Sequence, residues 1–157
     1  MKTFNILALR IAHKLAKSHA ESESNVVKTD GTEQLVQAVR RAAARMDKLG
    51  GKFEALAIFA HGIEHQVTCA NMSRQAGGFG IELASGLFLA KLQQLAPLAK
   101  QMKSMGLVRI SACAAADHAC PSSQKGQVVG NGRMLMSRIA KELDCCVIAS
   151  DTTQKYL

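Results

Sequence analysis

The chain has 157 residues, of which 48% are hydrophobic and 4% aromatic, and it contains no tryptophan. This length favours one domain with a core of its own. The low aromatic content argues against a nucleic-acid surface built on base stacking. The formal net charge of +8 is evenly divided between two parts of the chain. Positions 1–50 hold 9 basic and 5 acidic residues, and positions 51–157 hold 11 basic and 7 acidic residues. This distribution excludes a concentrated polybasic tail.

The amino-terminal part of the chain begins with strand signals. Residues 4–12 are apolar and partly β-branched, which predicts a strand, and residues 26–27 predict a short second strand after a polar loop. A helix follows, because apolar residues then recur at steps of three and four as far as Gly50. Asp30 or Thr32 can cap the start of this helix, and the glycine ends it.

The densest basic run in the chain, "RRAAAR" at residues 40–45, falls on this predicted helix. Such a run is typical of a solvated helix face, and contact with nucleic acid or another acidic surface is the alternative. We therefore do not expect a nucleic-acid partner.

The carboxyl-terminal part repeats the alternation of strand and helix. Residues 53–60 form an apolar run of strand length, and a helical pattern then covers residues 83–106, where Pro97 kinks or splits it. The remaining expected elements are a strand over residues 107–113, an amphipathic helix over residues 132–144 and a strand over residues 145–150.

Strands that are apolar throughout and alternate with helices indicate an α/β protein whose parallel sheet is covered on both faces. We expect a mostly parallel sheet of about 4–6 strands. No linker or repeat divides the sequence, so a single domain over residues 1–157 is predicted. In such sheets the working residues gather at the carboxyl ends of the strands, where His61, Cys113 and Asp151 fall.

Two of these residues suit nucleophilic catalysis. A thiol is an effective nucleophile once a nearby base raises its thiolate fraction, and His61 can serve Cys113 in this way if their strands are neighbours. Gly62 has no side chain, so a substrate carbonyl can approach its backbone N–H, which together with the N–H of Cys113 can stabilise an oxyanion.

The motifs "AIFAHG" at residues 57–62 and "RISAC" at residues 109–113, in this order and on predicted strands, resemble those of the caspase-like cysteine peptidases. Within that family the bacterial CHAT-type domains are the most similar in element order and length. The resemblance spans residues 4–151 and implies a caspase-like three-layer sandwich. It also implies a cysteine endopeptidase that acts without a cofactor on a peptide or protein, with Cys113 as the nucleophile and His61 as the general acid/base.

The carboxyl terminus bears on substrate choice and on assembly. The family usually adds a strand beyond the point where this chain stops, which implies a fragment, a trimmed domain, or a sheet completed by pairing in a homodimer or larger assembly. Ser150 and Asp151 follow the last predicted strand, where the pocket for the residue before the scissile bond is expected. The carboxylate of Asp151 would attract Arg or Lys, similar to the preference of separases and clostripains, unless it is an ordinary surface aspartate.

Two other functions stay open at this point. Cysteine is commonly a small buried hydrophobe, so the same fold can be an inactive binding or scaffolding module. The string "HGIEH" also fits a zinc-hydrolase pattern with His61 and His65 as ligands and Glu64 as base, but that pattern needs a helix, whereas a strand-like run leads into it. A looser zinc site that adds Cys69, Cys113, His118 and Cys120 to the two histidines fits no standard spacing.

The cysteine count and the amino terminus indicate a compartment. Five cysteines are an odd number in a chain too long to need disulfides, which favours free thiols in a reducing environment. Arg10 interrupts the apolar amino-terminal segment, no small-residue cleavage site follows, and no run approaches the ~20 apolar residues of a membrane helix. We expect a cytoplasmic protein that has no membrane partner.

Overall fold

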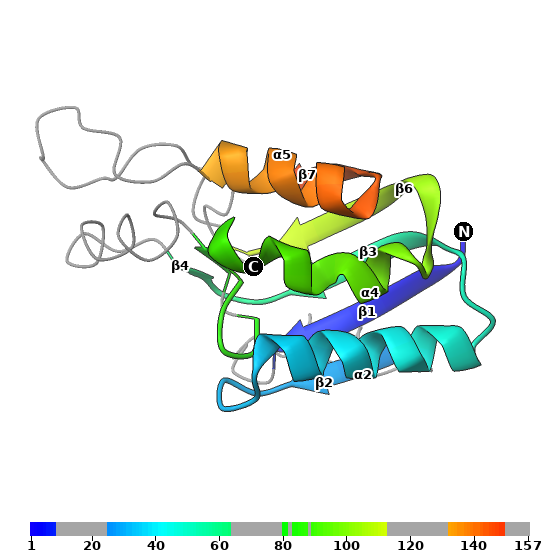
Figure 1. Ribbon diagram of the computed structural model, residues 1–157, viewed down its shortest axis with the longest axis horizontal. Coiled ribbons are helices and arrows are strands. Elements are labelled where there is room, and N and C mark those ends of the chain that lie inside the picture. Colours follow the sequence, from blue (N-terminus) through cyan, green and yellow to red (C-terminus); the bar gives the residue numbers. More distant parts are fainter. Residues whose placement is uncertain (9–24, 64–79, 82, 88, 113–131, 150–157) are drawn as a thin grey trace, which may run out of the picture.

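The computed structural model describes residues 1–8, 25–63, 80–81, 83–87, 89–112 and 132–149. Within them, five strands form one all-parallel sheet in the order β2-β1-β3-β6-β7 (Figure 1). This confirms the predicted α/β class and the parallel sheet. The strands are β1 (Thr3–Ala8), β2 (Val26–Thr29), β3 (Phe53–Phe59), β6 (Met102–Ser111) and β7 (Cys145–Ala149).

The described helices form one layer on one face of this sheet. They are α2 (Leu35–Lys48), α5 (Gly132–Leu143) and, between these, the 3-10 helix η1 (Leu89–Leu95), which continues into the short α4 (Ala96–Ala99). The connections from β2 to β3, from β3 to β6 and from β6 to β7 all cross the sheet in the same direction. Right-handed connections of this kind place their helices on the same face. The sequence predicts helices on both faces, whereas the described helices occupy this face only.

None of the described helices is both long and apolar enough to span a lipid bilayer.

The segment predicted as a long helical pattern, kinked or split at Pro97, departs most from expectation. Leu92 and Leu95 are three residues apart in η1, and the three-residue turn of a 3-10 helix places such side chains above one another, here on a buried side. Leu98 follows in α4 and is also buried. Pro97 lies in the first turn of α4, where its missing N–H breaks no intrahelical hydrogen bond. From Met102 onward the chain belongs to β6, so the helix predicted over residues 102–106 is wrong.

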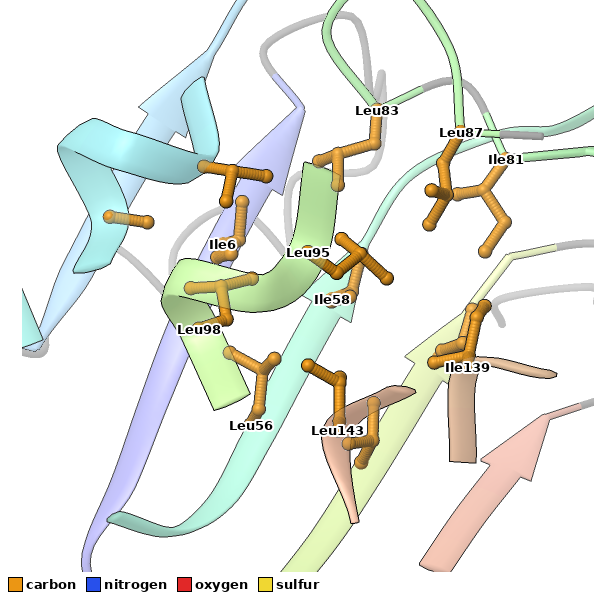
Figure 2. Close-up of a cluster of buried hydrophobic side chains, with 14 of the residues drawn as sticks. Ile6, Leu56, Ile58, Ile81, Leu83, Leu87, Leu95, Leu98, Ile139 and Leu143 are labelled. Carbon is orange, nitrogen blue, oxygen red and sulfur yellow. The ribbon is translucent and has the colours of Figure 1, made fainter. Parts of the chain in front are cut away.

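The core lies between the sheet and the helical layer (Figure 2). The strand register places Ile6, Ile58 and Ile110 side by side on β1, β3 and β6, and none of them is more than 2% exposed. Buried leucine and isoleucine side chains from the helices complete the cluster, among them Leu95, Leu98, Ile139 and Leu143.

The first part of β6 carries a bulge. Met102 pairs with Phe53 and Leu107 with Ala55, so residues 103–106 stand opposite the single residue Glu54. Lys103 Nζ donates to Glu54 Oε1 at 2.9 Å, and this contact lowers the pKa of the carboxyl group. The bulge therefore lies at the amino end of the strand, away from the edge on which the catalytic residues are expected.

The carboxyl end of α2 stops as predicted, at Lys48 and next to Gly50. This glycine has φ of +95°, a left-handed conformation that ends helices, and its N–H donates to the carbonyl of Asp47. Lys2 then holds the turn that follows the helix, because its Nζ donates to the carbonyls of Leu49 and Gly51 at 2.9 and 2.8 Å. The end of α2 is thus tied to the start of the chain by a tertiary contact.

The amino end of α2 is capped differently from the prediction. Asp30 Oδ1 accepts hydrogen bonds from the N–H groups of Thr32 and Glu33, so it stabilises a turn ahead of the helix. The first helical N–H, that of Leu35, donates instead to Ser85 Oγ at 3.0 Å. A side chain fifty positions away thus serves as the cap.

Ser85→Ala should therefore lower the free energy of unfolding by about 1 kcal/mol, because the Leu35 N–H loses its acceptor at a partly buried helix end. Urea denaturation followed by circular dichroism measures this loss. Ser137→Ala is the matched control on the exposed face of α5, where alanine favours the helix and no loss is expected. Equal stability of Ser85→Ala and the wild type would show that Ser85 is not a cap.

Candidate active site

The predicted catalytic residues follow two neighbouring strands. β3 and β6 pair in parallel, with Phe59 opposite Ser111, so the two strands are neighbours, which is the condition that a His61–Cys113 pair requires. The N–H of Ala60 donates to the carbonyl of Ser111 at 3.2 Å, so the hydrogen-bonded ladder continues one residue past the end of β3. Both strands thus end at the same carboxyl edge of the sheet.

His61 is the next residue along this edge. Ala60 before it is 5% exposed and belongs to the core, whereas the side chain of His61 is exposed. The imidazole therefore stands where the buried strand reaches solvent, as the sequence predicts. A histidine in this position is accessible to solvent.

Cys113 lies directly outside the described residues. The last described residue of this segment is Ala112, which follows β6 and is 1% exposed. Ser150 and Asp151, the predicted residues of a specificity pocket, also lie outside the described residues, one position past β7 and beyond. Of the predicted dyad, the structure thus describes His61 and the strands that lead to both residues.

Gly62 starts a second, two-stranded sheet beside His61. It belongs to β4 (Gly62–Ile63), which pairs antiparallel with β5 (Gly80–Ile81) so that Gly62 faces Ile81. The N–H of Ile81 donates to the carbonyl of Leu87 and its carbonyl accepts from the N–H of Leu87, so both backbone groups of Ile81 point away from β4. Gly62 and Ile81 are therefore a non-hydrogen-bonded pair of the antiparallel ladder, in which the backbone groups of both residues point away from the partner strand. The N–H of Gly62 thus points away from β5.

The backbone around His61 also bears on the zinc pattern. A helix is needed to bring two histidines four residues apart onto one face, but Gly62–Ile63 is extended in β4. Glu64, His65, Cys69, His118 and Cys120 lie outside the described residues. Among the residues that are described, no three His, Cys, Asp or Glu side chains gather closely enough to hold a metal ion.

Two adjacent cysteines at the start of β7 differ sharply in environment. Cys145 is buried and its thiol donates to the carbonyl of Leu143 at 3.1 Å, whereas Cys146 is exposed. Burial, followed by the negative charge of Asp144, raises the pKa of the Cys145 thiol. Because the pKa of Cys145 is higher in the folded chain than in the unfolded chain, ionisation of this thiol favours unfolding. The protonated thiol therefore contributes to stability at lower pH, and this contribution is lost as the pH rises above the ordinary thiol range.

Iodoacetamide at about pH 8 should therefore alkylate Cys146 in the folded protein while Cys145 stays protected, since the thiolate is the reactive form. Tandem mass spectrometry of the peptide that contains both cysteines shows which of the two carries the label. Denaturation in urea is the control and should make both thiols react. Rapid alkylation of Cys145 in the folded state would contradict the described packing of β7.

One cluster was given no specific role by the sequence. The basic run on α2, predicted to be a solvated face, contributes Arg41 and Arg45 to the lining of a cavity beside β2. The sequence signal for this cluster is the spacing of the basic residues Arg41, Arg45 and Lys48, which places all three on one side of the helix.

Comparison with known proteins adds no relative. No family model, no curated protein and no solved structure matches the chain. The candidate site is therefore defined by this chain's own residues and by the pairing of its strands.

Proposed function

We propose that the chain is a cysteine peptidase of the caspase-like kind, with Cys113 as nucleophile and His61 as general acid/base. One observation carries the proposal: Phe59 and Ser111 are paired on adjacent parallel strands, and each stands two residues before a member of the dyad. Neighbouring strands lie about 4.8 Å apart, so equal offsets from a paired position favour two side chains that reach the same edge at the same level.

In the proposed reaction His61 accepts the proton of the Cys113 thiol, and the sulfur attacks the carbonyl carbon of the scissile peptide bond. The new C–S bond makes a tetrahedral intermediate whose oxyanion accepts hydrogen bonds from the N–H groups of Gly62 and Cys113. The outward direction of the Gly62 N–H relative to β5 is in keeping with this role. The C–N bond then breaks as His61 protonates the leaving amine, and a water molecule, deprotonated by His61, hydrolyses the thioester.

Covalent labelling tests this proposal. A peptidyl electrophile that reacts with thiols should modify Cys113 in the wild type, and His61→Ala should slow this labelling by about 10²-fold, because the thiol loses its base. Cys146→Ser is the matched control: it removes an exposed thiol on β7 and should leave labelling of Cys113 unchanged.

The same experiment separates the alternatives. Equal labelling rates in the wild type and in His61→Ala would leave an ordinary accessible thiol and favour the binding or scaffolding module. Stoichiometric zinc in the purified protein, lost in His61→Ala, would favour the zinc hydrolase.

The proposal extends to substrate choice through Ser150 and Asp151, which follow the edge strand β7. A carboxylate at the carboxyl end of β7 would select Arg or Lys before the scissile bond by a charge-assisted contact. Fluorogenic peptide libraries should then show a basic preference that weakens by about tenfold in Asp151→Asn. A preference for Asp or for an apolar residue, or a basic preference unchanged in the variant, would remove Asp151 from this role.

A further inference from the structure

A surface cavity of about 300 Å³ lies at the β2 edge of the sheet, beside the second half of α2. Its described lining consists of Val27, Ala44 and the three cationic side chains of Arg41, Arg45 and Lys48, with no acidic residue among them. The cations are spaced at i, i+4 and i+7 on α2, so they share one side of the helix and surround the small side chain of Ala44.

One of the cations is held in place before any ligand binds. Arg41 donates to Glu33 through Nε at 3.1 Å and through one terminal nitrogen at 2.9 Å, and that nitrogen also donates to the carbonyl of Lys28 at 2.6 Å. These contacts fix the guanidinium against the outer edge of β2. A group fixed in this way loses little freedom when it binds an anion, which favours binding.

The helix dipole explains only part of this cluster. Arg45 and Lys48 lie in the last turn of α2, where the partial negative charge of the helix end favours cations. Arg41 lies a turn earlier, and like charges four residues apart weaken an isolated helix. Neither effect requires a hollow that is lined by Val27 and Ala44 as well as by the three charges.

We propose that this cavity binds the phosphate groups of a small polyanion, either an inorganic polyphosphate or the phosphate chain of a nucleotide. Glu33 compensates the charge of Arg41, and Arg45 and Lys48 are two further cations that line the hollow, which suits closely spaced negative charges. A small ligand is favoured over a nucleic acid because the cations gather within eight positions of one helix, whereas the net charge of the chain is evenly spread. The site lies on the β2 edge and includes no residue of the proposed dyad, so a binding experiment can test it without measuring peptidase activity.

Titration calorimetry with sodium tripolyphosphate at physiological ionic strength tests the proposal. The wild type should bind one equivalent, and the amide signals of Val27 and Ala44 should shift on binding in a ¹H–¹⁵N spectrum. The double variant Arg45→Gln/Lys48→Gln should raise the Kd by at least about tenfold. Arg40→Gln/Arg133→Gln removes the same charge from exposed positions that do not line the cavity and should change the Kd by less than about twofold.

A second variant separates a cavity from a merely basic surface. Ala44→Leu keeps every charge, substitutes a good helix former at an exposed position and fills the hollow, so it should also raise the Kd at least about tenfold. Unchanged affinity in Ala44→Leu, an equal loss in the control pair, or no saturable binding by the wild type would each overturn the proposal. Tighter binding of a nucleoside triphosphate than of tripolyphosphate would identify a nucleotide as the source of the phosphates, and equal affinity an inorganic polyphosphate.

Discussion

Replacing Cys113 with alanine should lower kcat/KM for a peptide substrate by at least about 10³-fold, because the reaction loses its nucleophile. His61→Ala should cost nearly as much, since the thiol then loses the base that deprotonates it. The double variant should be no less active than Cys113→Ala alone, because the members of a catalytic unit do not contribute additively. Steady-state hydrolysis of a fluorogenic peptide measures all three effects.

The control for this series is Cys146→Ala, which removes an exposed thiol at the edge of the sheet and should keep activity within about twofold of the wild type. Circular dichroism should show that Cys113→Ala folds, since alanine fills most of the volume of cysteine. Full activity of Cys113→Ala on a verified substrate would assign the nucleophile elsewhere. Hydrolysis that survives in His61→Ala at the wild-type rate would remove the histidine from the mechanism.

Leu56→Ala should lower the free energy of unfolding by about 2–5 kcal/mol, because it opens a cavity between the sheet and the helical layer. Leu56 is fully buried on the central strand β3 and points toward the layer that carries Leu98 and Leu143 (Figure 2). Urea denaturation at 25 °C measures the change as a lower midpoint with an unchanged slope.

Leu107→Ala is the matched control on the neighbouring strand β6. Its side chain is half-buried and alternates to the sheet face opposite that of Val108, away from the helical layer. The control should therefore lose less than half as much stability as Leu56→Ala. Equal losses in the two variants would contradict the core described here, because they would place both faces of the sheet in equally buried surroundings.

The predicted elements that proved correct are those whose signal is local. The apolar run before His61 forms β3, and the amphipathic pattern before Gly50 forms α2. A buried parallel strand must be apolar on both faces, and a helix on a sheet must be apolar on one side, so these patterns are visible in any short window. For the same reason the position of His61, at the exposed end of a buried strand, was predictable.

The elements that proved wrong depend on distant residues. The start of β6 shows no apolar run, and its Met105 has a φ of +57°. Two tertiary contacts hold the bulge: Lys103 donates to Glu54, and the N–H of Met105 donates to the carbonyl of Asp144. The cap of α2 likewise comes from a residue far along the chain, Ser85. Such contacts exist only after the fold has formed, so no local pattern indicates them.

The Ser85 cap has a consequence for the motions of the candidate site. The turn that carries Ser85 is bonded at its base through Ile81 and Leu87, and Ile81 faces Gly62, the residue after His61. The first turn of α2 and the backbone beside His61 are therefore joined through one short segment. We therefore expect a fluctuation that frees the Leu35 N–H to loosen the segment opposite Gly62 as well. The order of the proposed oxyanion donor would then depend on the stability of a helix end that lies outside the candidate site.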